Sequence, residues 1–228
     1  MDYIIPELVN TLGMSQNKYH DCDVWEHTMR VLDKVPAKLE LRLAALLHDI
    51  GKINTKTVEN GEVHFYKHEL EGVPLVEMAL KSLKFSNKII DKVKILVGEH
   101  MRTKMYGPNA EVSTKALRKL KYDLGENLND LLELIHADNC SHAPNSKMPN
   151  QVPMILKKLN ELKDEPPKIK LPINGNDLIE TFGINPGPII KELLDVVKES
   201  VLTSPDISKQ DALGIVGEYF RIHYAKLC

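Results

Sequence analysis

The chain has 228 residues, of which 43% are hydrophobic and 27% charged, and its formal net charge is −2. This composition is typical of a globular protein, and the three widely spaced cysteines argue against a disulfide framework or a zinc knuckle. The sequence has no run of about 18 apolar residues and no apolar segment after a basic start. We therefore expect no membrane span, no secretory signal and a cytoplasmic location.

Two helices are predicted in the first fifty residues. Asp23, followed three residues later by Glu26, is typical of a capping box and opens a helix that runs to about Val35. The next helix spans residues 38–50, is apolar nearly all round and is stopped by Gly51. A helix with this pattern is expected to be buried.

The only strand-like stretch is residues 55–66. Asn60 and Gly61 at its centre are typical of a two-residue type I′ hairpin turn. Apolar periodicity then predicts four helices, two of them capped by Ser86 and Ser113. These helices span residues 68–84, 86–101, 113–123 and 126–139.

A proline-rich stretch divides the chain, because six prolines fall between residues 144 and 172 and disfavour helix before each of them. Three further helices are predicted at about 175–182, 187–203 and 208–226. We therefore predict an all-α fold, a helical bundle with one small β-hairpin followed by a smaller helical C-terminal domain. The predicted limits are 1–145 for the bundle, 146–172 for a helix and linker, and 173–228 for the C-terminal domain.

Several predicted helices carry a polar residue on or beside an apolar face. The buried helix in LRLAALLHDIGK ends in His48 and Asp49. A single histidine of this kind is more often a hydrogen-bonded core residue than a ligand. A buried carboxylate, however, needs a compensating charge, which a divalent cation supplies. Four other helices show the same pattern, at His27, His68, His100 and Asp138.

Histidine and carboxylate side chains together are typical ligands of divalent metals. The residues of the predicted site are His27, His48, Asp49 and Asp138. Asp49 could bridge to a second ion, whose other ligands would be His68 and His100. One or two ions per chain are expected, and Mn, Ni, Co, Fe, Zn and Mg all stay open. The remaining histidines show no comparable pattern: His20, His64, His136, His142 and His223.

The order of these residues resembles the H…HD…D signature of the HD superfamily of metal-dependent phosphohydrolases, of which HDIGK is a frequent form. YHDCDVWEHTMRVLD, GEVHFYKHELEG and LKFSNKIIDKVKILVGEHM resemble the HD region of bacterial CCA-adding tRNA nucleotidyltransferases. LPINGNDLIETFGINPGPIIKELLDVV resembles the helical tail of those enzymes. The resemblance covers about residues 19–205 and implies that the bundle of residues 1–145 is an HD domain.

The resemblance also implies roles for individual residues. The four residues of the predicted site would be the metal ligands, and His68 and His100 would contact phosphate or hold the second ion. Lys52 would reach a phosphate oxygen. The alternative for Lys52 is a cation at a helix C-terminus, where the helix dipole favours positive charge. The predicted catalytic residues are Asp49, Lys52, His68 and His100.

The CCA-adding enzymes begin with a nucleotidyltransferase head, which carries a Gly-Ser pair followed by a D-x-D metal motif. This chain does not match that head. This sequence contains no Gly-Ser dipeptide. Asp21 and Asp23 match D-x-D by spacing only, since Asp23 is a predicted helix cap. We therefore expect no nucleotide addition by this chain alone.

The middle of the chain is basic: residues 81–122 contain 11 Lys and Arg residues but only 3 Asp and Glu residues. Such a segment is typical of a contact with a phosphate backbone, and a pair of solvated helix faces is an equally good interpretation. Its predicted RNA or phosphate contacts are Arg102, Lys104, Arg118, Lys119 and Lys121.

The leading hypothesis is a stand-alone HD-type phosphohydrolase or phosphodiesterase acting on nucleotide or RNA-end phosphate esters, such as 2′,3′-cyclic phosphates and 2′-phosphates. One alternative is a tRNA- or RNA-binding module with a structural metal site. Another is an HD nucleotidase acting on a soluble nucleotide. The sequence does not determine the oligomeric state or exclude a separate nucleotidyltransferase partner.

Overall fold

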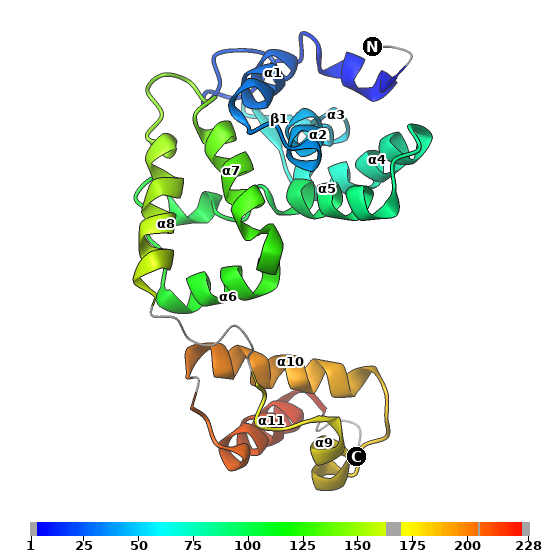
Figure 1. Cartoon of the computed structure of the whole chain (residues 1–228), viewed down its shortest axis with the longest axis vertical. Helices are drawn as coiled ribbons and strands as arrows, with labels where there is room; N and C mark the ends of the chain where they lie inside the picture. Colours follow the sequence, from blue (N-terminus) through cyan, green and yellow to red (C-terminus); the bar gives the residue numbers. More distant parts are fainter. Residues whose placement is uncertain (1–3, 163–169, 205, 225–228) are drawn as a thin grey trace. The chain divides into compact units, whose positions relative to one another are not determined.

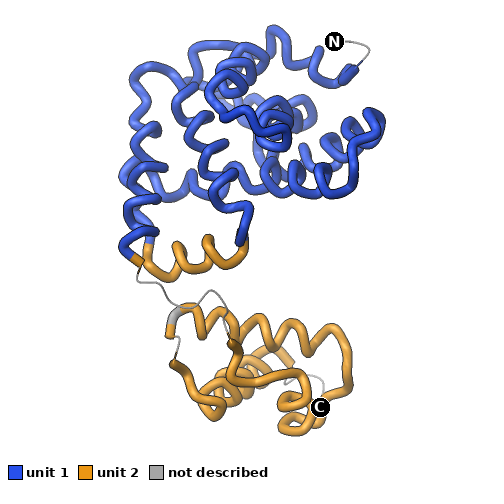
Figure 2. Tube along the Cα trace, in the orientation of Figure 1, with its two compact units in different colours: residues 1–112, 124–161 blue, residues 113–123, 162–228 orange. Residues whose placement is uncertain are grey.

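The computed structural model describes residues 4–162, 170–204 and 206–224, and these confirm the all-α fold with one small hairpin (Figure 1). The chain divides into two compact units (Figure 2). Unit 1 comprises residues 1–112 and 124–161, and unit 2 comprises residues 113–123 and 162–228. The domain limits expected from the sequence, 1–145, 146–172 and 173–228, stay a prediction. Within the described ranges, no helix is long and apolar enough to cross a membrane.

Unit 1 is built around α2, which packs against α1, α5 and α7, while α5 also packs against α4 (Figure 1). Leu41, Ala44 and Leu47 of α2 are fully buried, as the apolar pattern predicts. The elements of unit 1, with η for 3-10 helices, are η1 (Pro6–Thr11), α1 (Val24–Lys34), α2 (Leu39–Leu47), α3 (Lys52–Thr55), β1 (Lys56–Glu59), β2 (Glu62–Phe65), α4 (His68–Ser82), α5 (Asn87–Glu99), η2 (Lys104–Tyr106), η3 (Gly125–Asn127), α7 (Leu128–Asn139), η4 (Met148–Asn150) and α8 (Gln151–Glu161).

The local signals at the start of unit 1 are confirmed in part, because the cap at Asp23 forms while Glu26 pairs with Arg30 and does not complete a capping box. The Asp23 carboxylate accepts a hydrogen bond from the backbone N–H of Glu26, at 2.7 Å, and so caps α1. The Glu26 carboxylate itself accepts from Arg30. In the hairpin, Asn60 and Gly61 both have positive φ, 53° and 82°, as a type I′ turn requires.

The helix predicted over residues 38–50 ends earlier, at Leu47, and a new short helix, α3, begins at Lys52. The reason lies in the close approach of two backbones. A Cβ built at Gly51 would lie 2.1 Å from the carbonyl oxygen of His68 and 2.6 Å from the backbone nitrogen of Gly72. Gly51 therefore lets the turn after α2 lie directly against α4.

Unit 2 contains most of α6 (Thr114–Leu124) together with α9 (Gly175–Phe182), α10 (Pro188–Thr203) and α11 (Lys209–Tyr224). The last three helices pack on one another. Asn174 and Asp177 form a reciprocal capping box at the start of α9. The fully apolar core of these helices comprises Ile173, Leu178, Leu193, Val197, Val201, Ala212 and Val216.

Two parts of the predicted middle segment behave differently. The expected helix is α8, which belongs to unit 1, and Pro166 and Pro167 of the predicted linker lie outside the described residues.

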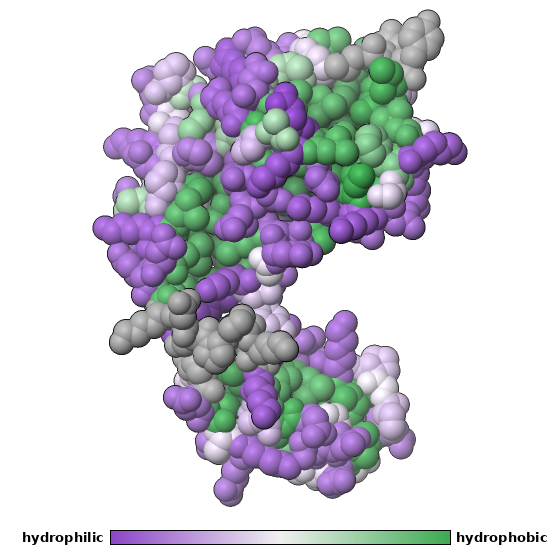
Figure 3. Space-filling model, in the orientation of Figure 1, coloured by the Kyte–Doolittle hydropathy of each residue, from purple (hydrophilic) through white to green (hydrophobic). Residues whose placement is uncertain are grey.

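On the face shown in Figure 3, hydrophilic residues cover much of unit 1, and apolar residues gather over α4 and α5. The exposed apolar side chains of α4 include Leu70 and Met78.

Candidate metal centre

Six titratable side chains from five helical regions meet inside unit 1, and we call them the metal centre. They come from α1, from the turn after α2, from the start of α4, from the end of α5 and from α7. Each is at most 5% exposed. The members of the metal centre are His27, His48, Asp49, His68, His100 and Asp138.

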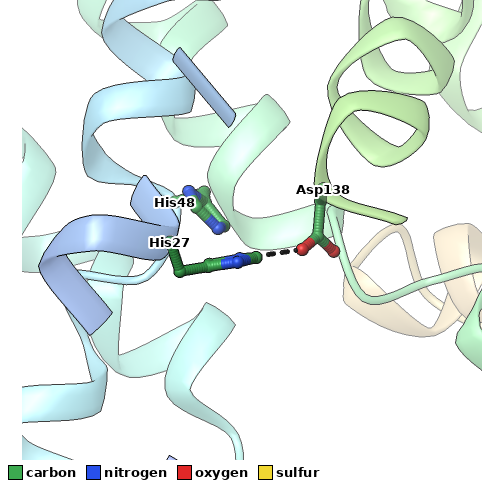
Figure 4. Close-up of side chains that lie close together, drawn as sticks. All are labelled: His27, His48 and Asp138. Carbon is green, nitrogen blue, oxygen red and sulfur yellow. Dashed lines mark hydrogen bonds and ion pairs between the residues drawn. The ribbon is translucent and has the colours of Figure 1, made fainter. Parts of the chain in front are cut away.

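The metal centre divides into two groups of three. In the first, ligand atoms of His27, His48 and Asp138 all lie within 4.8 Å of one another, and the two histidines point toward the carboxylate (Figure 4). His27 Nε2 is 3.0 Å from Asp138 Oδ1. The second group comprises Asp49, His68 and His100, with the same spacing. The structure thus brings all the sequence-predicted ligands together.

Asp49 belongs to the second group and also faces the first, so that one of its oxygens lies toward the histidines of each group. Its Oδ2 is 3.2 Å from His48 Nε2 and 3.8 Å from His27 Nε2. Its Oδ1 is 3.2 Å from His68 Nε2 and 4.0 Å from His100 Nε2. This placement is the one that a carboxylate bridging two cations requires.

The orientation of the four imidazoles fits a cation. In every ring Nδ1 faces a backbone carbonyl oxygen, at 2.7 to 3.3 Å, which assigns the proton to Nδ1 and turns the Nε2 lone pair inward. The buried Nε2 of His48 has no hydrogen-bond partner. His68 Nε2 and His100 Nε2 face each other at 3.2 Å, so two lone pairs meet there. Inward-facing acceptors of this kind are what a metal ion satisfies.

Electrostatics act differently on the members of the metal centre. Burial alone would lower the pKa of His48, but the neighbouring carboxylates of Asp49 and Asp138 raise it, whereas burial lowers the pKa of His27. Burial alone would raise the pKa of Asp49, but His48 and Lys52 hold it well below its usual range. The pKa of Asp138 is likewise lowered: burial alone would raise it, but Lys104, His142 and His27 together outweigh that effect. Burial lowers the pKa of His100 to about 3. The carboxylates are therefore ionised and His100 is neutral near pH 7.

Lys52 is the first residue of the four-residue α3, which follows the turn after α2, and its role stays a prediction. It is 5% exposed, and its Nζ is 2.7 Å from both Asp49 Oδ2 and Gln16 Oε1. The ammonium also lies 5.2 Å from the centre of the Phe65 ring. Lys52 thus stands beside the metal centre, where a phosphate contact is possible.

The five predicted RNA contacts are divided between the two units. Lys104 lies at the metal centre, with Nζ 2.7 Å from Asp138 Oδ2. Arg102 pairs with Glu99 in unit 1, and Lys119 pairs with Glu199 in unit 2. The role of the basic residues in RNA binding stays a prediction. The two remaining members, half-buried Arg118 and exposed Lys121, lie on α6.

Two histidines set aside on sequence grounds also lie at the metal centre. His142 Nε2 is 3.5 Å from Asp138 Oδ1, and the His20 ring is 4.7 Å from that of His27. Burial lowers the pKa of His20 to about 2. His142 follows the end of α7 at Asn139, so helical periodicity does not reveal it. His20 lies in a loop, where no periodicity reveals it.

Fold and site together define a helical protein with a buried histidine and carboxylate centre suited to divalent cations. Comparison with known families then places it more closely. The family model described as tRNA nucleotidyltransferase domain 2 matches residues 72–214, and the chain belongs to this family. The match includes His100 and Asp138 and begins after the His48 and Asp49 doublet.

Curated relatives point the same way. The A-adding tRNA nucleotidyltransferase of Deinococcus radiodurans is 28% identical, over 88% of this chain and 47% of its own length. The CC-adding enzyme of Thermus thermophilus is also 28% identical, over 91% and 48%. The multifunctional CCA protein of a Janthinobacterium species is 31% identical, over 61% and 34%. The chain spans about half the length of the first two relatives, and the resemblance to tRNA nucleotidyltransferases is confirmed.

Proposed function

We propose that the protein is an HD-type metal-dependent phosphohydrolase or phosphodiesterase that acts on nucleotide or RNA-end phosphate esters. The observation that carries this proposal is the convergence of four Nε2 atoms and two carboxylates in one buried centre. A buried cluster of this composition is costly without a bound cation. The names of the relatives refer to tRNA, which favours an RNA substrate.

Each part of the metal centre has a role in this proposal. His27, His48 and Asp138 would hold one cation and His68 and His100 a second, with Asp49 shared between them. When bound, a divalent cation supplies hydroxide at neutral pH and draws charge from phosphoryl oxygens. Lys52 holds a positive charge beside Asp49 and would orient a phosphate oxygen. The backbone carbonyls that accept from Nδ1 keep the imidazoles in a fixed orientation.

The proposal is tested with the full chain, purified, stripped of metal and reloaded with Mn²⁺, Co²⁺, Ni²⁺, Zn²⁺ or Mg²⁺ in turn. Hydrolysis of 2′,3′-cyclic nucleotides, nucleoside 2′-phosphates and deoxynucleotides is then measured. We expect metal-dependent turnover that is lost in the His48→Ala, Asp49→Ala double variant and kept in His223→Ala, which alters an exposed histidine of unit 2. Turnover that survives the double variant contradicts the proposal. Preference for deoxynucleotides would favour the soluble-nucleotide alternative.

A second candidate is an RNA-binding module whose metal centre serves structure alone. Membership of a tRNA nucleotidyltransferase family favours it. It predicts binding of tRNA that weakens steeply with salt, together with no turnover of any phosphate ester. Binding of labelled tRNA at several salt concentrations, beside the hydrolysis assay, separates the two candidates. Turnover lost on chelation excludes the second.

A further inference from the structure

A group of buried polar side chains lies behind the metal centre, next to Asp138. Gln151, the first residue of α8, is fully buried and uses its whole amide group. Its Oε1 accepts from Thr103 Oγ1 at 3.0 Å and from Asn139 Nδ2 at 3.2 Å. Its Nε2 donates to the backbone carbonyls of Thr103 and Gly107, at 2.8 and 2.9 Å. A buried amide is favourable only when all its groups are paired, and here they are.

This hydrogen-bonded network leads directly to Lys104. Gln151 holds the backbone on both sides of Lys104, through the two carbonyls at residues 103 and 107. Asn139, which donates to Gln151, accepts from Lys104 Nζ at 2.9 Å. The same Nζ donates to Asp138 Oδ2 at 2.7 Å. Gln151 therefore holds the backbone beside Lys104 and also holds Asn139, which accepts from the Lys104 ammonium.

The two oxygens of Asp138 have different partners. Oδ1 faces His27 Nε2 within the metal centre, and Oδ2 accepts from Lys104. We propose that Gln151 is a positioning residue of the metal centre, which places Lys104 on Asp138 and so orients the Asp138 carboxylate toward a cation. This inference rests on the metal centre of the proposed function. Groups that orient a metal ligand typically change metal affinity by about 10- to 100-fold when they are removed.

The experiment measures Co²⁺ affinity by visible absorption on the metal-stripped full chain. The variants are Gln151→Met, Lys104→Met and the double variant, each checked for folding by circular dichroism. We expect each single variant to weaken Co²⁺ binding by about 10-fold or more. The double variant is expected to be no weaker than Lys104→Met alone, because Gln151 acts through Lys104. Ile155→Val is the matched control: it alters a buried apolar residue of the same helix and should leave affinity within twofold.

The outcomes separate this inference from the proposed function. Unchanged or tighter Co²⁺ binding in Lys104→Met overturns it, and so do additive losses in the double variant. If Gln151→Met fails to fold, Lys104→Met still tests the contact through which Gln151 acts, since the Lys104 side chain is 19% exposed and its replacement removes only the contacts of its Nζ with Asp138, Asn139 and His142. No Co²⁺ binding by the unaltered chain contradicts the metal centre itself. If all variants bind Co²⁺ as tightly as the unaltered chain does, only the positioning role of Gln151 is contradicted.

Discussion

Unit 1 and unit 2 bury different kinds of side chain. Among the described residues, every buried polar or charged side chain lies in unit 1, and all six members of the metal centre are among them. The buried side chains described in unit 2 are apolar, as Leu178, Leu193 and Val216 show. The ion pair of Lys209 with Asp177 in unit 2 involves an exposed lysine.

This difference shows where packing alone explains the structure and where it does not. Apolar burial stabilises a fold by itself, at about 25 cal/mol per Å² of apolar surface. Buried charges lower stability unless a counter-charge accompanies them. Unit 2 therefore needs no ligand to account for its core, whereas the buried charged side chains of unit 1 are best explained by a functional role.

Trp25, the single tryptophan, lies in α1 and makes the unfolding of unit 1 visible separately by fluorescence.

The largest effect is expected from Gly51→Ala. The new Cβ would lie 2.1 Å from the His68 carbonyl oxygen and 2.6 Å from the backbone nitrogen of Gly72, so α4 would have to shift. We expect the free energy of unfolding of unit 1 to fall by roughly 4 kcal/mol or more, measured by urea denaturation with Trp25 fluorescence.

The matched control for that substitution is Gly214→Ala in α11, where an added Cβ meets no atom within 4 Å. It should stabilise unit 2 by up to about 1 kcal/mol, because alanine is the better helix former, and leave the Trp25 transition unchanged. If both substitutions changed the Trp25 transition equally, the two units would not unfold independently.

Leu193→Ala should act on the other unit. Leu193 is fully buried in the apolar core of unit 2, and removing three carbon atoms there should cost about 3 kcal/mol of stability. Circular dichroism should show the loss of helix at lower urea concentration. Co²⁺ affinity should stay within twofold of that of the unaltered chain, since all members of the metal centre lie in unit 1. A large loss of Co²⁺ binding would show that the metal centre depends on unit 2.

Metal should stabilise unit 1 selectively. Free Co²⁺ at 100 times its dissociation constant should raise the free energy of unfolding by about 2.7 kcal/mol, because the folded state alone presents the assembled centre. The Trp25 transition should move to higher urea concentration and return on addition of a chelator. His48→Ala should abolish the shift. A shift of the same size in that variant would place the bound Co²⁺ elsewhere.

The smallest effect concerns Asp130, which lies away from the metal centre. Its side chain is 11% exposed, with Lys92 Nζ at 2.6 Å and Lys38 Nζ at 2.9 Å. Burial alone would raise the pKa of Asp130, but the two lysines outweigh it and the pKa is lowered. The ionised carboxylate therefore stabilises unit 1 above its unfolded pKa of about 3.9, and this contribution is lost as the pH falls through the lower folded pKa.

Asp130→Asn should accordingly cost about 1 kcal/mol at pH 7, a modest value because Lys38 is half-exposed. The difference from the unaltered chain should shrink between pH 5 and pH 3, measured with chelator present. Asp195→Asn, which alters an exposed carboxylate of unit 2, should change stability by much less. A pH-independent loss in Asp130→Asn would point to packing rather than charge.

Much of the molecule is predictable from local chemistry. Apolar periodicity and caps predict the helices, and Asn60 with Gly61 predicts the hairpin, because these signals act within a few residues. The same periodicity identifies His27, His100 and Asp138, since a polar residue on an apolar helix face is visible without a structure. His48 and Asp49 stand out because they directly follow a helix that is apolar nearly all round.

Only the tertiary structure decides which of these faces meet. Helical periodicity reports one helix at a time, so it does not show that Asp49 offers separate oxygens to two pairs of histidines. It also does not show His20, which lies in a loop, or Gln151, whose partners are backbone carbonyls 44 and 48 residues away. The sequence by itself determined the ligand types and the helices that carry them. Packing between distant segments determined their geometry, because side chains meet there through contacts that no local pattern encodes.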